Sequence, residues 1–254
     1  MAGASLQRGA RAPRSKTTAA LLAVFFLAAF VAFVLLGSWQ VQRRAWKLDL
    51  IERVEQRVHA APTPAPGPDA WAGVSAATDE YRHVTLAGVF LHQKEALVQA
   101  TTVKGGGFWV LTPFDIGDGT TVLVNRGFVA PENRALASHG GDRPVGLTTV
   151  TGLLRMTEPG GGFLRKNDPA GDRWYSRDVA AIAAARGLDR TAPYFVDADA
   201  AVWASADEPV GGLTVISFPN SHLVYAVTWF GLAALTVVGA FIWLREERRP
   251  RRAA

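Results

Sequence analysis

Two long stretches without a charged residue constrain this chain more than any other feature. Residues 19–37 read "AALLAVFFLAAFVAFVLLG", and residues 223–244 read "LVYAVTWFGLAALTVVGAFIWL". A helix needs roughly 20 apolar residues to cross a hydrocarbon core about 30 Å thick, so each stretch predicts a transmembrane helix. The first stretch is longer than the apolar run of a signal peptide, and no A-x-A-like cleavage site follows it. We therefore expect both spans to be retained.

Basic residues gather at both ends of the chain. The first sixteen residues contain four basic residues and no acid, and the last ten contain five arginines against two glutamates. Basic ends beside apolar spans favour the cytoplasmic side of a membrane. Much of the net charge of +5 therefore lies at the ends of the chain. We interpret it as a signal of membrane orientation, and we predict no nucleic-acid partner. With an Ala/Arg/Gly-rich composition and no transit-peptide pattern, we expect a bacterial inner membrane, with both termini cytoplasmic and the main domain periplasmic.

The region between the spans divides into a helical stalk, a linker and a β-rich domain. Apolar residues at 48, 51, 54 and 58 recur at helical spacing, and four prolines between 62 and 68 favour a stiff extended linker. The predicted parts are a basic tail at 1–18, a span at 19–38, an amphipathic stalk at 39–59, a proline-rich linker at 60–78, a periplasmic β-rich domain at 79–219, a span at 220–244 and a basic tail at 245–254.

The β-rich domain is predicted from short runs of Val, Thr, Leu and aromatic residues between Gly- and Asp-rich turns. The helix signal at 176–188 has Ser176 or Asp178 at its start and Gly187 at its end. The predicted class is an α+β membrane protein, with two transmembrane helices flanking a mainly antiparallel, barrel- or sandwich-like domain that one helix covers. The expected strands are 81–90, 95–103, 107–116, 120–129, 148–156, 192–199 and 212–218.

Catalytic chemistry finds little support in the sequence. The chain has no cysteine, which excludes disulfides, thiolate metal sites and c-type haem attachment. Asp115 and Asp118 lie in "DIGDG", which is typical of a hairpin turn. The glycine runs lack the lysine of a phosphate loop, and the other histidines show no metal-ligand spacing. We predict no catalytic turnover.

Asn125 and Arg126 are polar residues between the apolar residues of "VLVNRGFVAPENR". In one interpretation the arginine sits at a strand end and pairs with an acid of its own domain. In the other, Asn125 and Arg126 contact a partner protein.

His222 stands at the start of the second apolar stretch, in "NSHLVYAVTWF". One interpretation is an interfacial residue at a helix N-terminus that Asn220 or Ser221 caps. The other is cofactor ligation, because the positive end of a helix disfavours imidazolium and haem iron binds neutral imidazole. Tyr225 and Trp229 follow at i+3 and i+7, on the helical face where a flat apolar macrocycle would pack.

Trp39 and Arg43 lie at i,i+4 at the matching border of the first span. Arg43, Arg44 or Lys47 would there meet carboxylates such as haem propionates. Interfacial anchoring of the span by Trp and Arg explains the same residues.

Four motifs in this order resemble the Surfeit locus protein 1 family of cytochrome c oxidase assembly factors. They are "LGSWQVQRRAWK" after the first span, "VLVNRGFVAP" and "PYFVDAD" in the domain, and "NSHLVYAVTWF" at the second span. The resemblance covers residues from about 35 to 244. Phe128 departs from the family pattern, in which a tryptophan is common.

The resemblance implies help in maturing the catalytic subunit of a haem-copper oxidase. It further implies transient binding of haem a with His222 as the iron ligand, and haem a synthase as a further partner. An alternative function is a cofactor-free membrane scaffold that stabilises an oxidase assembly intermediate through its periplasmic domain.

Overall fold

The computed structural model describes residues 16–134, 145–162, 164–200, 209–214, 216 and 218–248. The predicted basic tails at 1–18 and 245–254 lie largely outside these residues. The chain forms two compact units, one made of residues 1–50 and 218–254 and the other of residues 51–217.

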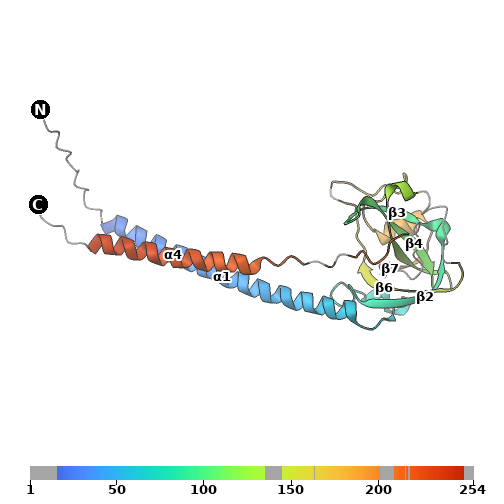
Figure 1. Ribbon diagram of the computed structural model, residues 1–254, viewed down its shortest axis with the longest axis horizontal. Helices are drawn as coiled ribbons and strands as arrows, with labels where there is room; N and C mark the ends of the chain where they lie inside the picture. The colour runs from blue at the N-terminus through green and yellow to red at the C-terminus, as the bar shows by residue number, and fades with distance from the viewer. Residues whose placement is uncertain are drawn as a thin grey trace, which may run out of the picture. The chain divides into compact units, whose positions relative to one another are not determined.

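The first unit contains α4 (His222–Arg248) and most of α1 (Lys16–His59), whose residues from Ile51 onward belong to the second unit. Both are long and apolar enough to cross a membrane. They lie side by side and antiparallel in Figure 1. Aromatic contacts fix this direction, since Phe26 of α1 meets Trp243 with ring centroids 6.1 Å apart and Phe33 meets Trp229 at 5.8 Å. Helix α1 continues without interruption through the predicted stalk to His59.

The residues that α1 and α4 bury follow a regular spacing of three and four, which is typical of helices that pack at a shallow angle. We call these positions the helix seam. Position 37 lies on the seam and is a glycine, because a methyl group there would come within 2.7 Å of the Phe230 ring. The seam consists of positions 26, 29, 33, 37, 40, 44 and 47 of α1 and positions 222, 226, 229, 233, 236, 240 and 243 of α4.

The second unit is a closed β-barrel. The strands pair in the order β1-β2-β6-β7-β5-β4-β3, and a further pairing of β2 with β4 closes the sheet. The β5–β7 and β1–β2 pairs are parallel and the others are antiparallel. The strands are β1 (Thr63–Pro64), β2 (His83–Phe90), β3 (Ala96–Thr102), β4 (Gly105–Asp115), β5 (Thr120–Val129), β6 (Thr148–Met156) and β7 (Arg190–Ala198).

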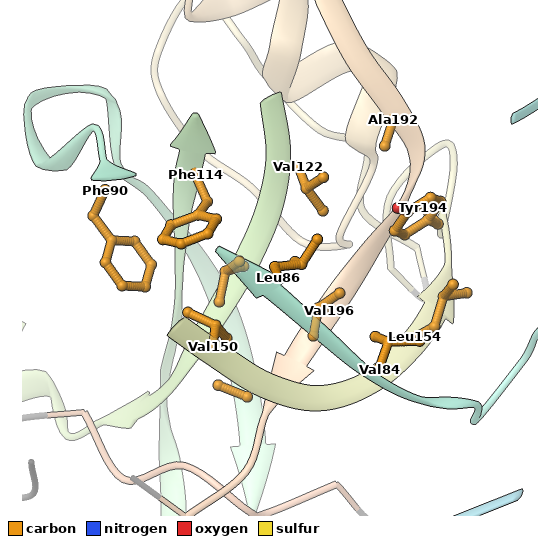
Figure 2. Close-up of a cluster of buried hydrophobic side chains, with 12 residues drawn as sticks. Val84, Leu86, Phe90, Phe114, Val122, Val150, Leu154, Ala192, Tyr194 and Val196 are labelled. Carbon is orange, nitrogen blue, oxygen red and sulfur yellow. The ribbon is translucent and has the colours of Figure 1, made fainter. Parts of the chain in front are cut away.

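The barrel interior is a cluster of aliphatic and aromatic side chains from β2, β4, β5, β6 and β7 (Figure 2). Phe90 and Phe114 meet edge to face, with ring centroids 4.7 Å apart. The ten residues of β5 are all buried, because this strand pairs on both sides and is covered on both faces.

The covering helix is α3 (Val179–Ala185), which buries Val179 and Ile182 in a second cluster with Trp174 and Phe195. Asp178 is its N-cap, and the carboxylate accepts a hydrogen bond from the backbone N–H of Ala181 at 3.1 Å. The described residues also include the short 3₁₀ helices Pro68–Gly73, His92–Lys94 and Pro131–Asn133.

The proline-rich segment is extended as predicted at Thr63–Pro64, but it packs on the barrel and belongs to its unit. Its β1 strand pairs with β2, and Trp71 packs on the barrel core. Tyr194 of β7 donates a hydrogen bond from its hydroxyl to the Pro66 carbonyl at 2.7 Å, and burial raises the pKa of Tyr194 to about 12. A proline offers no N–H to the sheet but keeps its carbonyl, and that carbonyl holds the segment in place.

The stretch at 212–218, predicted as a strand, is irregular in its described residues. Gly212 has a φ of +68°, which turns the chain out of an extended path. Val210 just before it makes an isolated bridge with Phe128. The "DIGDG" stretch is the predicted turn, where Asp115 accepts a hydrogen bond from the Gly117 N–H at 2.8 Å.

His83 joins two distant parts of the barrel unit. Its Nδ1 lies 3.0 Å from the Ala60 carbonyl, and its Nε2 lies 2.8 Å from an oxygen of Asp199. Both partners are acceptors, so the ring satisfies both only when it is protonated. Burial opposes the charge, but the hydrogen bonds to Asp199 and Ala60 prevail, and the pKa of His83 is raised above 6.5.

We predict that stability of the barrel unit falls as pH rises through the raised pKa of His83. A raised pKa in the folded state contributes stability in full below about 6.5, the value for the unfolded chain, and this contribution is lost above the folded pKa. Urea unfolding of the detergent-solubilised protein between pH 5 and 9, for wild type and His83→Gln, measures the effect. The wild-type advantage should shrink with rising pH, and an advantage independent of pH would contradict the prediction.

Candidate functional site

Helix α4 begins at His222, at one end of the helix seam. The Ser221 carbonyl accepts hydrogen bonds from the N–H groups of Val224 at 3.1 Å and Tyr225 at 3.4 Å, which places Ser221 at the N-cap position. Asn220 is not the cap, because its side-chain oxygen is buried and meets no donor among the described residues.

The ring of His222 is held by Gln40 of α1. Nδ1 of the ring lies 2.8 Å from the Gln40 side-chain oxygen, and Gln40 is only 8% exposed. An amide oxygen only accepts hydrogen bonds, so Nδ1 is the donor in this contact, and in the neutral ring Nε2 then carries the lone pair. In the part of the chain that the structure describes, Nε2 makes no hydrogen bond. The ring therefore presents the nitrogen that a metal ion would use.

Gln40 was not among the site residues that the sequence pattern predicted, although it lies in the "LGSWQVQRRAWK" motif. The signal for it is the helix register. Phe33 stacks on Trp229, and one heptad further along each antiparallel helix come Gln40 and His222. Pairing the two apolar stretches by their aromatic residues would have brought these two side chains together.

The structure brings only one of the predicted aromatic residues onto the seam with His222. Trp229 lies there, stacked on Phe33 with an angle of 23° between the rings. Tyr225 points away from the seam and is 53% exposed. From His222 the seam continues at i+4 and i+7, which are Ala226 and Trp229. Tyr225 is at i+3 and therefore points to a different side of the helix.

Trp39 and Arg43 also lie off the seam. Trp39 is 54% exposed, and the Arg43 guanidinium lies over the Trp46 ring, 4.1 Å from its centroid. Arg44 and Lys47 follow Gln40 at i+4 and i+7 and so share its face. Lys47 donates a hydrogen bond to the Pro219 carbonyl, in the turn that precedes His222. Arg44 is thus better placed than Arg43 to meet an anion beside His222.

Asn125 and Arg126 lie inside the barrel unit. Arg126 is 2% exposed, and its Nη1 lies 3.0 Å from Glu95, which is 5% exposed. Asn125 donates a hydrogen bond to Asp197 at 2.7 Å. The ion pair between Arg126 and Glu95 confirms the interpretation that the arginine pairs with an acid of its own domain. Asn125 and Arg126 both belong to β5, whose residues are all buried. Neither side chain is placed for the predicted partner contact.

Asp197 of β7 is the centre of a second buried polar cluster. Its carboxylate accepts hydrogen bonds from Arg155 and Arg177 at 3.0 Å and from the Thr214 hydroxyl at 3.0 Å. Gly127 has a φ of +138°, and a methyl group there would come within 2.3 Å of the Val210 backbone. The "NRGF" stretch thus contacts the segment 210–214 through Gly127, and the "FVDAD" stretch binds it through Asp197. This segment precedes His222 in the sequence.

The architecture defines a class: a closed β-barrel that two helices of membrane-spanning length flank in the sequence. The family model for the SURF1 family matches residues 27–234. The chain is 36% identical to Surfeit locus protein 1 of Rattus norvegicus over 227 residues, 83% of this chain and 71% of that protein. It is 36% identical to Surfeit locus protein 1 of Homo sapiens over 84% of this chain and 73% of that protein. A SURF1-like protein of Drosophila melanogaster is 34% identical over 83% of this chain and 72% of that protein. The chain belongs to the SURF1 family.

We predict that Arg126→Ala destabilises the barrel unit strongly and Arg173→Ala does not. Removing Arg126 leaves the buried Glu95 carboxylate with only His92 and the Thr112 hydroxyl as partners among the described residues, and breaking a buried ion pair typically costs about 3–5 kcal/mol. Arg173 also pairs with an acid, Asp168, at 2.5 Å, but its side chain is 67% exposed. Chemical unfolding of both variants in detergent, followed by tryptophan fluorescence, compares the two pairs. Equal midpoint shifts would show that burial does not set the strength of the Arg126 pair.

Proposed function

We propose that this chain is a membrane-anchored assembly factor for a haem-copper cytochrome c oxidase and holds haem a through His222. One observation carries the proposal. The ring of His222 is fixed through Nδ1 by a buried amide, and Nε2 is left available at the end of an apolar helix seam. Membership of the SURF1 family supports it.

The residues around His222 fit a flat, acidic macrocycle with an apolar body. Bound haem a would supply an iron atom, which His222 would hold through Nε2. The stacked pair of Phe33 and Trp229 offers an aromatic wall on the same seam, about two helical turns along α4 from His222. Arg44 and Lys47 provide positive charge on the same face for carboxylates. Each of these groups comes from the seam, so one helix register positions them all.

The proposed topology places His222 at the outer border of a bacterial inner membrane. Helix α4 has 27 residues, which at about 1.5 Å per residue is more than enough to cross the hydrocarbon core. Its other end carries Arg245 and Arg248, which favour the cytoplasmic side. The barrel unit would then be periplasmic.

The proposed partners are the catalytic subunit of the oxidase, which would receive haem a, and haem a synthase, which would supply it. The chain is proposed to hold and transfer haem a without chemical turnover. A cofactor-free scaffold is the other function that the sequence suggests. Its proposed contact residues, Asn125 and Arg126, are buried, so the structure offers no argument in its favour.

The first test is the visible spectrum of the protein purified from cells that make haem a. We expect His222→Ala to lose most of the haem a absorbance, because the axial ligand is gone. His59→Ala is the matched control, since the His59 side chain is 74% exposed at the end of α1. A wild-type spectrum in His222→Ala would refute the ligand. Full oxidase assembly with that variant would favour the scaffold function.

The second test compares two neighbouring arginines. We expect Arg44→Ala to weaken retention of haem a roughly tenfold or more, because a hydrogen bond to a charged group is worth about 1.5–3 kcal/mol. Arg43→Ala should change retention little, since Arg43 lies over Trp46 away from the seam. Titration of the apo-proteins with haem a in detergent measures both dissociation constants. A larger loss for Arg43→Ala would reverse the assignment.

A further inference from the structure

We infer that Gln40 is a positioning residue for His222, which fixes the ring in the tautomer with the proton on Nδ1 and sets its orientation. The role toward haem a rests on the proposed function. The tautomer does not, because it follows from the contact between the two side chains.

The contact joins residues that lie 182 positions apart in the sequence. Gln40 is 8% exposed and lies at a seam position whose neighbours in register are Phe33 and Gly37. A buried amide in an apolar setting costs free energy unless its polar atoms are hydrogen-bonded. An apolar side chain would fill the same position without that cost. The hydrogen bond to Nδ1 of His222 explains why a glutamine stands at position 40.

The register of the helices keeps Gln40 opposite His222. On one side, Gly37 lets the Phe230 ring approach closely, and Phe33 stacks on Trp229. On the other side, Lys47 donates to the Pro219 carbonyl. Contacts on both sides of the pair therefore resist a slide of one helix along the other. Both Gln40 and His222 lie on helices, so the position of the amide oxygen relative to Nδ1 does not depend on the conformation of a loop.

The chemical consequence lies in the second nitrogen. Histidines that bind metals generally donate their other N–H to a carboxylate, a carbonyl or water, and loss of that partner typically weakens metal binding by about 10–100-fold. Gln40 supplies a neutral acceptor. A carboxylate in its place would make the ring a stronger electron donor, and a methionine would leave the Nδ1 proton without an acceptor.

The test uses three variants of the full-length protein in detergent. Gln40→Met removes the acceptor at similar size. Gln40→Glu keeps an acceptor. Gln42→Met is the matched control, because Gln42 is exposed on α1 two positions away. In haem-free wild type labelled with ¹⁵N-histidine, the ring nitrogen shifts of His222 should report the proton on Nδ1. Gln40→Met should lose this preference, and Gln42→Met should keep it.

Haem a titrations of the same proteins give the second readout. We expect Gln40→Met to bind about 10–100-fold more weakly and Gln42→Met to bind as wild type. Gln40→Glu should restore binding and lower the reduction potential of the bound haem, since a carboxylate partner raises ligand basicity. A role in helix packing alone would not move the potential.

The outcomes separate this inference from the proposed function. A wild-type ring with the proton on Nε2 would overturn the inference, whatever Gln40→Met does to folding. Tautomer and affinity in Gln40→Met equal to wild type would overturn it as well, and would leave haem a binding by His222 intact. If wild type binds no haem a but shows the predicted tautomer, the proposed function fails and the positioning role of Gln40 stands.

Discussion

The antiparallel register of α1 and α4 is the constraint on which the candidate site depends. A rotation of either helix by one residue would turn Gln40 or His222 out of the seam, because successive helical residues point about 100° apart. The register is set by interlocking shapes, with Gly37 beneath the Phe230 ring and Phe33 against Trp229. Close packing of small and aromatic residues is how helices recognise each other in lipid, where apolar surface alone gives little preference. These apolar contacts therefore position the polar pair of Gln40 and His222.

The barrel unit holds its charges inside. Glu95 pairs with Arg126, and Asp197 gathers Arg155 and Arg177, all with little exposure. Such clusters are poor sources of net stability, but they tolerate little change because removing one member strands the others. They join strands to the segments that enter and leave the barrel, such as Thr214 on Asp197. The polar residues of these motifs therefore attach the connecting segments to the strands of the barrel.

Local patterns predicted most of the fold. The runs of β-branched and aromatic residues gave six of the seven expected strands in position, and the capping pattern gave α3. What local patterns did not reveal came from tertiary contacts. Four prolines predicted a stiff extended linker, and the structure adds that the Pro66 carbonyl accepts a hydrogen bond from Tyr194, 128 residues away. Gly212 has a positive φ, and the described residues of the last expected strand are irregular.

The candidate site was predictable in part for a similar reason. His222 was found from its own surroundings, as a titratable ring at the start of an apolar helix. Gln40 depends on which residue of the other helix lies opposite, which spacing within one helix does not reveal. The same lack of register left Arg43, Arg44 and Lys47 undistinguished, although only Arg44 and Lys47 share the helical face of Gln40. For Asn125 and Arg126 the sequence left open a partner contact and a pairing within the domain, because it does not reveal that β5 is buried along its whole length.

The closure of the barrel has a consequence for the order of events during synthesis. Strand β7 lies between β5 and β6 and is the last of the seven to leave the ribosome, while β5 pairs with it in parallel. Until β7 arrives, β5 and β6 each keep an open edge, and strands with open edges are prone to wrong pairing. In the proposed topology α1 is inserted into the membrane before β7 is made, so the unfinished sheet is already tethered to a membrane helix while two of its strands have open edges.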